Sequence, residues 1–151
     1  MSVDIERAPE PVAIAALLGL RTAEAYSALR LAEAVENGVP PASLARALKR
    51  IDPANRIVVP TDIVSRATLA RLKARQASLS PAAGERVIGV LKVYLAALKA
   101  FGRDSEAALD FLGRRHALLA GKRPIDVATA STVGADAVLD LIAAADAGFA
   151  V

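Results

Sequence analysis

The chain has 151 residues, a formal net charge of +3 and no cysteine, and 54% of its side chains are hydrophobic. This length fits one ordinary domain with its own hydrophobic interior. The lack of cysteine excludes disulfides, thiolate metal sites and cysteine nucleophiles. The apolar runs are far shorter than the roughly 18–20 residues of a membrane span, and MSVDIERAPEP at the start lacks the pattern of an export signal. We therefore expect a soluble, cytoplasmic protein.

Alanine and leucine dominate the sequence and runs of β-branched residues are few, so the chain is predicted to be an all-α, compact helical protein. Residues 52–65 are expected to form a loop or a short broken helix, because Ile57, Val58 and Val59 favour extended structure and Pro60 interrupts a helix. In chain order, apolar periodicity predicts helices at about residues 12–19, 22–37, 41–51, 65–76, 80–102, 105–112 and 135–147, with a further short helix beginning at Pro124.

Capping residues mark several of the expected helix ends. Thr22, Ser65 and Ser80 precede periodic segments and are predicted N-caps, while either Asp104 or Ser105 begins the next helix. The glycines at positions 38, 102 and 148 are expected to end helices. The helix at residues 80–102 is the predicted core helix, with one apolar stripe made of Val87, Ile88, Leu91, Tyr94, Leu95, Leu98 and Phe101.

Charge is distributed unevenly along the chain. Residues 66–103 contain eight basic side chains and one acidic side chain, whereas residues 124–151 contain four aspartates and no lysine or arginine. This asymmetry indicates two partners of different chemistry.

The basic stretch SRATLARLKARQ, residues 65–76, is a candidate DNA-binding helix. Helix-turn-helix proteins lay such a helix in the major groove and hold the flanking phosphates with basic and small polar side chains. The alternative is a solvated charged face. The candidate DNA contacts are Arg66, Thr68, Arg71, Lys73 and Arg75.

The stretch GRRHALLAGKRPIDVATA, residues 113–130, contains the only histidine. Its GKR triplet lacks the glycine framework and the following Ser or Thr of a phosphate-binding loop. For His116 we expect a loop position with a structural hydrogen bond, not a catalytic role with Ser105 and Asp104. Asp136 and Asp140 share a helix face, where contact with solvent or a partner is expected instead of acid–base chemistry. We predict no catalytic residues, no metal site and no cofactor.

Residues 111–148 read FLGRRHALLAGKRPIDVATASTVGADAVLDLIAAADAG, with an aromatic–leucine pair, a turn, a glycine, a proline, an acid, and later glycines at a helix start and end. This pattern resembles the toxin-binding domain of the MbcA/ParS/Xre antitoxins. LSPAAGERVIGVLKVYLAALKAFG, residues 79–102, is similar to the family's central helix, and IDPANRIVVPTDIVSRATL, residues 51–69, to its Xre-like helix-turn-helix.

The sequence departs from the family pattern at several positions. His116 stands in place of asparagine, Ala120 in place of one of two glycines, and Phe111 in place of tryptophan. The residues IVVP occupy the first helix of the helix-turn-helix. We therefore expect a degenerate helix-turn-helix within an N-terminal region at residues 1–78, and a toxin-binding domain with its central helix at residues 79–151.

The resemblance implies an antitoxin that neutralises a RES-domain toxin, an enzyme that consumes NAD by breaking it down or by transferring ADP-ribose. It also implies a homodimer, a larger toxin–antitoxin assembly, and repression of its own operon through operator DNA. Two alternatives remain open: a helix-turn-helix DNA-binding regulator without a toxin, and a helical scaffold.

The C-terminal segment, residues 121–151, is expected to cover the toxin's NAD-binding cleft. A site that holds pyrophosphate is basic, so four aspartates without a compensating cation would complement it. The last residues would add apolar contacts and a terminal carboxylate. The candidate toxin contacts are Lys122, Arg123, Asp126, Asp136, Asp140, Phe149 and Val151.

Overall fold

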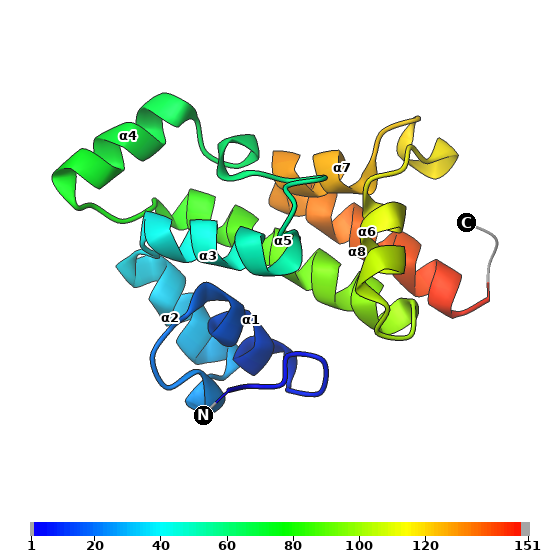
Figure 1. The fold of residues 1–151 in the computed structure, drawn as a ribbon, viewed down its shortest axis with the longest axis horizontal. Coiled ribbons are helices and arrows are strands. Elements are labelled where there is room, and N and C mark those ends of the chain that lie inside the picture. The colour runs from blue at the N-terminus through cyan, green and yellow to red at the C-terminus, as the bar shows by residue number, and fades with distance from the viewer. Residues whose placement is uncertain (1, 149–151) are drawn as a thin grey trace.

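A computed structural model describes residues 2–148 of the chain, which are all helix, turn and loop without a strand (Figure 1). The prediction of an all-α protein is confirmed. Three short 3-10 turns are η1 (Ala23–Ala25), η2 (Pro60–Asp62) and η3 (Ala117–Leu119). The α-helices are α1 (Glu10–Leu18), α2 (Ala28–Asn37), α3 (Pro41–Ile51), α4 (Arg66–Arg75), α5 (Pro81–Ala100), α6 (Ser105–Leu112), α7 (Pro124–Ala130) and α8 (Thr132–Asp146).

Three predicted helix starts are confirmed by capping hydrogen bonds. The Ser65 hydroxyl accepts from the Thr68 backbone N–H at 3.2 Å, and the Ser80 hydroxyl accepts from that of Ala83 at 3.2 Å. At α6 it is the Asp104 carboxylate that caps the helix. Each cap satisfies a backbone N–H that the first turn of a helix leaves without a partner.

The predicted start of α2 at Thr22 is wrong. Thr22 has a left-handed φ of +54° and precedes η1, and its hydroxyl donates to the Arg21 carbonyl. Tyr26 is extended, with ψ of +135°, so the helix begins only at Ala28, where the Ser27 hydroxyl accepts from the Arg30 N–H at 3.1 Å. The predicted end at Gly38 is confirmed by its φ of +104°.

The start of α8 is also earlier than predicted. The helix begins at Thr132 instead of about Ala135, because the Ser131 hydroxyl accepts from the Gly134 N–H at 2.9 Å. Gly134 therefore lies in the first turn, with its Cα directly against the Val127 carbonyl, where no side chain fits. This close contact brings the beginning of α8 against α7.

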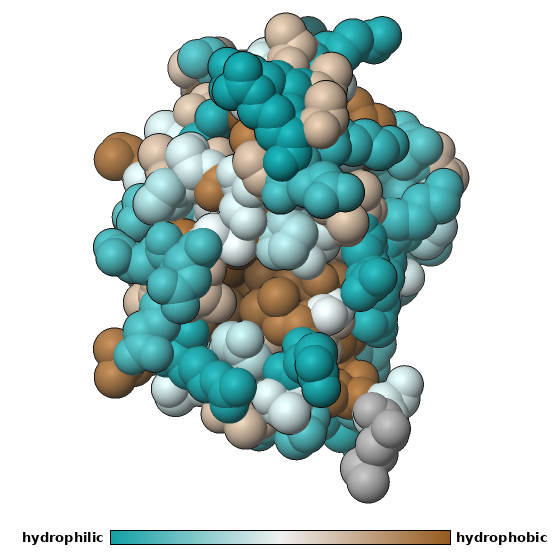
Figure 2. Space-filling model, turned by 90° about the vertical axis from the view of Figure 1, so that its left-hand side faces the viewer, coloured by the Kyte–Doolittle hydropathy of each residue, from teal (hydrophilic) through white to brown (hydrophobic). Residues whose placement is uncertain are grey.

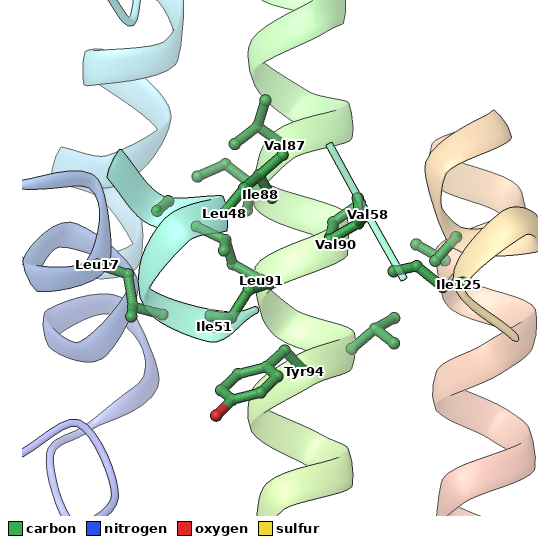
Figure 3. Close-up of a cluster of buried hydrophobic side chains, with 14 of the residues drawn as sticks. Leu17, Leu48, Ile51, Val58, Val87, Ile88, Val90, Leu91, Tyr94 and Ile125 are labelled. Atoms are coloured by element: carbon green, nitrogen blue, oxygen red, sulfur yellow. The ribbon is translucent and has the colours of Figure 1, made fainter. Parts of the chain in front are cut away.

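The central helix α5 is buried on more than the single predicted stripe. Val90 and Val93 lie off that stripe and are completely buried, whereas Phe101 is 37% exposed. The reason is that α5 packs against α1, α2 and α3 on one side and against α6, α7 and α8 on the other. Figure 3 shows Leu17 and Ile51 on one side of α5 and Ile125 of α7 on the other. The division after residue 78 stays a prediction.

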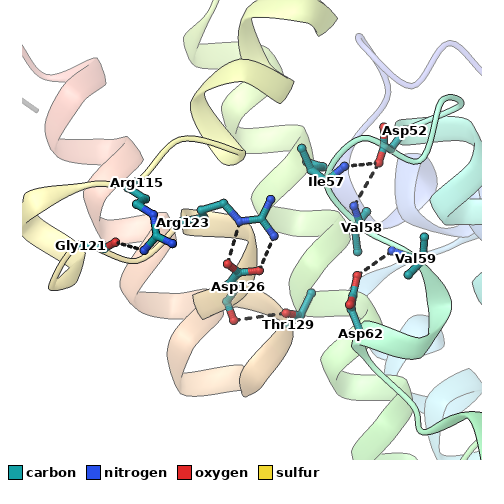
Figure 4. Close-up of polar contacts among 10 residues, drawn as sticks. All are labelled: Asp52, Ile57, Val58, Val59, Asp62, Arg115, Gly121, Arg123, Asp126 and Thr129. Atoms are coloured by element: carbon teal, nitrogen blue, oxygen red, sulfur yellow. Dashed lines mark hydrogen bonds and ion pairs between the residues drawn. The ribbon is translucent and has the colours of Figure 1, made fainter.

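The long connection between α3 and α4, residues 52–65, is ordered by one buried carboxylate. Asp52 is fully buried and accepts from the N–H groups of Arg56, Ile57 and Val58 at 2.8–3.1 Å. Figure 4 shows the two bonds from Ile57 and Val58. Of the two predicted forms, a loop or a short broken helix, the structure has the loop, which contains the single 3-10 turn η2.

The same connection is bound to α6 by Arg56. The Arg56 guanidinium contacts Glu106 at 2.9 Å and Asp110 at 2.8 Å. These two carboxylates raise the pKa of Arg56 above its ordinary value. No helix within residues 2–148 is both long and apolar enough to cross a lipid bilayer.

Candidate functional site

The stretch between α6 and α7 folds back on itself as a closed loop. The His116 N–H donates to the Lys122 carbonyl at 3.0 Å, and the Gly121 N–H donates to the His116 carbonyl at 2.9 Å. The Arg115 guanidinium also donates to the Gly121 carbonyl, at 3.2 Å (Figure 4). Ala120 and Gly121 have left-handed φ values of +56° and +77°, which make the reversal possible. The loop presents Lys122 to solvent.

Aromatic packing anchors this loop to the helices beneath it. The ring of His116 lies 5.9 Å from that of buried Phe111, at an interplanar angle of 60°. Phe111 in turn lies 5.3 Å from Phe101. The His116 Nδ1 atom is buried without a hydrogen-bond partner among the described residues. The structural hydrogen bonds expected of His116 are therefore formed by its backbone, while its ring serves as a packing group.

A bidentate ion pair stands at the beginning of α7. Arg123 is the N-cap residue, Pro124 occupies the first turn, and the Arg123 guanidinium holds both Asp126 oxygens at 2.8 Å (Figure 4). The pair raises the pKa of Arg123, chiefly through the hydrogen bonds that its guanidinium donates to Asp126. The expectation of uncompensated aspartates is thus wrong for Asp126, because its cation precedes the acidic segment by one residue.

The other end of α7 is held by α5. The Arg86 guanidinium donates from Nε at 3.2 Å and from Nη2 at 2.8 Å to the Thr129 carbonyl. This carbonyl lies in the last turn of α7, where the helix has no partner for it. Arg86 therefore fixes the orientation of α7 relative to the core helix.

The remaining predicted toxin contacts lie apart from this loop. Asp136 and Asp140 are exposed on α8, and Asp136 borders a groove that α8 forms with α2 and α5. Phe149 and Val151 lie outside the described residues. The structure thus brings together Lys122, Arg123 and Asp126 and places Asp136 and Asp140 on a second surface.

The predicted DNA contacts lie on α4, which projects from the body of the protein (Figure 1). All four basic side chains of this set are exposed, whereas Thr68 is half-buried and its hydroxyl accepts from that of Ser65. A helix-turn-helix joins its helices by a turn of about 3–4 residues. Here the turn η2 takes the place of the first helix, which is the degenerate form expected from IVVP.

Sequence reasoning missed the supports of the site. Arg56, Glu106, Asp110 and Arg115 hold the connection and the loop in place. Their charges are visible in the sequence, but the partners of Arg56 are 50 and 54 residues away. Only Asp52 gives a local signal, because it directly precedes the loop whose backbone N–H groups donate to its carboxylate.

The polar groups considered for catalysis have structural contacts. The Asp104 carboxylate accepts from the Ala107 N–H at 3.1 Å, and His116 packs on Phe111. Within residues 2–148 no group of three or more His, Asp or Glu side chains is placed to hold a metal ion.

Comparison with known proteins agrees with this geometry. Residues 96–148 match the family described as the antitoxin Xre/MbcA/ParS C-terminal toxin-binding domain. The match begins in α5 and includes α6, the closed loop, α7 and α8. The family resemblance seen in the sequence is confirmed for this segment. No curated protein matches the chain.

Proposed function

We propose that this chain, whose residues 96–148 match the toxin-binding domain of the Xre/MbcA/ParS antitoxins, is an antitoxin that neutralises a RES-domain toxin that consumes NAD. The observation that supports this most directly is the position of the match, which coincides with the closed loop, α7 and α8. The antitoxin acts by binding, in the cytoplasm, and performs no chemistry of its own. The toxin's reaction is either NAD breakdown or ADP-ribosyl transfer.

The proposed binding surface is centred on the closed loop and the beginning of α7. Lys122 is exposed, and the Arg123–Asp126 pair is half-exposed beside it, with 34% and 53% of the two side chains accessible. The two charges of the Arg123–Asp126 pair neutralise each other. The pair therefore contributes its shape to the contact and no net charge. Lys122 forms no ion pair within the described residues, so it is free to meet an acidic group of the toxin.

The second part of the proposed surface is the acidic C-terminal segment. Asp136 and Asp140 lie exposed on α8, and the sequence after the described residues reads Phe149, Ala150 and Val151. A cleft that binds the pyrophosphate of NAD is basic, so this segment would complement its mouth. We propose that Phe149 and Val151 enter the cleft and prevent NAD from binding.

The proposal is tested by purifying this protein with the RES-domain product of a neighbouring gene and measuring NAD turnover. We expect a stable complex and loss of NAD turnover when this protein is in excess. The variant Lys122→Glu should weaken inhibition, whereas Lys49→Glu, the same change at an exposed position on α3, should not. A toxin that remains fully active in the presence of excess antitoxin would contradict the proposal.

The role of the C-terminal residues needs a separate test. A chain that ends at residue 148 keeps all the described helices, so it should fold normally. We expect it to bind the toxin but to inhibit NAD turnover less than the full chain. Equal inhibition by both chains would remove the tail from the mechanism and leave the surface of the loop and α7 as the inhibitor.

A second candidate function, autorepression, is favoured by the exposed basic helix α4. We propose that the protein binds operator DNA as a homodimer, with Arg66, Arg71, Lys73 and Arg75 on phosphates. Binding to the DNA upstream of its own gene should weaken steeply with salt. Arg71→Ala should reduce the salt slope by about one, and Lys99→Ala, at the far end of α5, should leave it unchanged. Salt-dependent binding to this DNA by a protein that neither binds nor inhibits a toxin would indicate a DNA-binding regulator and not an antitoxin.

A further inference from the structure

An apolar groove separates α2 from α8 and has α5 as its floor. It has a volume of about 440 Å³. The buried apolar lining comprises Leu31 and Val35 of α2, Ile88 of α5 and Ala135 of α8, with half-buried Leu139 of α8 beside them. Gly89 permits the close approach of α5 and α8 there, since a Cβ at this position would lie 3.0 Å from that of Ala135. Figure 2 shows the hollow as an apolar area surrounded by hydrophilic side chains.

The charges around this groove are predominantly negative. Its lining includes four acidic side chains and a single basic one, Lys92. Within residues 2–148 none of these five forms an ion pair within 4 Å. The acids are Glu10, Glu36, Glu85 and Asp136. A helix that fills the groove should therefore carry cations on both sides of an apolar face.

Helix α4 has this pattern on its outward face. Leu69 and Leu72 are half-buried and pack against the core of their own chain. The opposite face, at helical spacing, consists of Ala67, Ala70 and Ala74, all of which are exposed. Arg66 and Lys73 flank this alanine face on one side, and Arg71 and Arg75 flank it on the other. None of these cations forms an ion pair within the described part of the chain.

The helix and the groove are displayed on the same side of the molecule. Figure 1 shows α4 projecting at the upper left, and Figure 2, which views that side, shows the hollow below it. A two-fold axis that lies in the plane of the interface, perpendicular to the line from α4 to the groove, would place α4 of each copy over the groove of the other. The two contacts of such a dimer are identical, as closed two-fold symmetry requires.

We infer that the groove between α2, α5 and α8 receives helix α4 of a second copy of this chain, in a reciprocal two-fold dimer. This inference rests on the homodimerisation proposed above and assigns an interface to the dimer that forms in the absence of operator DNA. Small alanine side chains allow the helix backbone to approach the apolar floor closely, while the flanking cations meet the acids of the rim. Operator DNA and the second copy would compete for α4, because both require its basic side chains.

The test exchanges the charges of the two surfaces. One variant carries Arg71→Glu and Lys73→Glu on α4, and the other carries Glu36→Lys and Glu85→Lys on the groove. We expect the wild type to sediment at low salt with twice its chain mass of 15.6 kDa. Each variant alone should weaken dimerisation by more than about tenfold, because like charges then face each other in both contacts.

Mixing the two variants is the decisive measurement. In a mixed dimer, the acidic α4 meets the basic groove and the basic α4 meets the acidic groove, so both contacts are attractive again. We expect equimolar mixing to restore the dimer, and a chain that carries all four substitutions to dimerise by itself. Circular dichroism checks that each variant is folded before its mass is measured.

A matched control places the same charge change elsewhere. Lys99→Glu with Arg103→Glu alters two exposed cations at the far end of α5 and should leave the dimer intact. A wild type that stays monomeric at all concentrations overturns both the interface and the proposed homodimer. A dimer that withstands the single-surface variants overturns only the interface. Inhibition of the toxin, measured separately, tests the antitoxin function independently of either result.

Discussion

Gly113 lies directly against Ile57. A Cβ built on Gly113 would be 2.8 Å from Ile57 Cγ2 and 3.3 Å from the Leu109 carbonyl oxygen. The φ of Gly113 is −92°, so its backbone conformation is open to any residue. Glycine is required here by the close approach of the connection at residues 52–65 to the end of α6.

We predict that Gly113→Ala lowers the free energy of unfolding by about 1–3 kcal/mol, because the added methyl group forces the connection away from α6. Urea denaturation measures the loss. The matched experiment repeats the substitution in an Ile57→Ala background, where the clashing Cγ2 atom is gone. The same loss in both backgrounds would show that the contact with Ile57 is not the cause.

Asp52→Asn should destabilise the fold by about 2 kcal/mol or more. The Oδ2 atom of Asp52 accepts from the N–H groups of Ile57 and Val58, and Oδ1 accepts from that of Arg56. An asparagine keeps the shape but turns one of these acceptors into a donor, which leaves at least one of the three N–H groups facing another donor. Denaturant unfolding of the variant measures the effect.

Asp62→Asn provides the control in the same connection. The Asp62 carboxylate accepts one hydrogen bond, from the Val59 N–H at 2.8 Å, and the residue is exposed. Water can replace the lost partner, so we expect a cost below about 1 kcal/mol. If Asp52→Asn and Asp62→Asn lowered the free energy of unfolding by similar amounts, the buried hydrogen bonds of Asp52 would contribute little to stability.

Local signals account for the parts of the fold that the sequence predicted. Ser65 and Ser80 cap helices, and Pro41, Pro81 and Pro124 begin them, because these roles depend on the residue and its nearest neighbours. The start of α2 was mispredicted although Thr22 is a favourable cap type, since the chain forms η1 and an extended residue before the helix.

The arrangement of the candidate site depends on contacts between distant residues. The pairing of Arg123 with Asp126 is local, but Arg123 stands one residue before the acidic segment 124–151, so the composition of that segment does not reveal it. The anchoring of the closed loop by Phe111 and His116 follows from a backbone reversal that no spacing rule specifies. The family pattern located this segment, whereas its geometry required the structure.

Tyr94 should make the protein less stable at high pH. Burial raises the pKa of the Tyr94 phenol above its ordinary value, with nearby Glu6 adding to the effect and Arg50 opposing it. The folded state therefore keeps the phenolic proton at a pH where the unfolded chain loses it. This contribution to stability is complete below pH about 10 and is lost as the pH rises through the pKa of the folded state.

The variant Tyr94→Phe isolates this contribution. We expect the denaturation midpoint of the wild type to fall more steeply above pH about 10 than that of the variant. Below pH about 9 the two midpoints should run parallel, because the phenol is then protonated in both states. Parallel curves across the whole alkaline range would exclude Tyr94 as the source of the pH dependence.

His116→Phe should raise the free energy of unfolding by about 1 kcal/mol. The buried Nδ1 atom of His116 has no hydrogen-bond partner within the described residues, and the ring already packs on Phe111. Phenylalanine keeps the aromatic contact and removes the unsatisfied nitrogen. The bonds from His116 to Gly121 and Lys122 are unaffected, since its backbone forms them.

The contrasting variant His116→Asn keeps a polar group at this position but removes the ring. It should lower the free energy of unfolding, by about 1–3 kcal/mol, through the lost packing on Phe111. Thermal and urea denaturation of the two variants at neutral pH provide the comparison. If His116→Phe were instead the less stable variant, the Nδ1 atom would have to gain a partner in solution, such as a bound water molecule, and the ring would then orient the loop through a hydrogen bond.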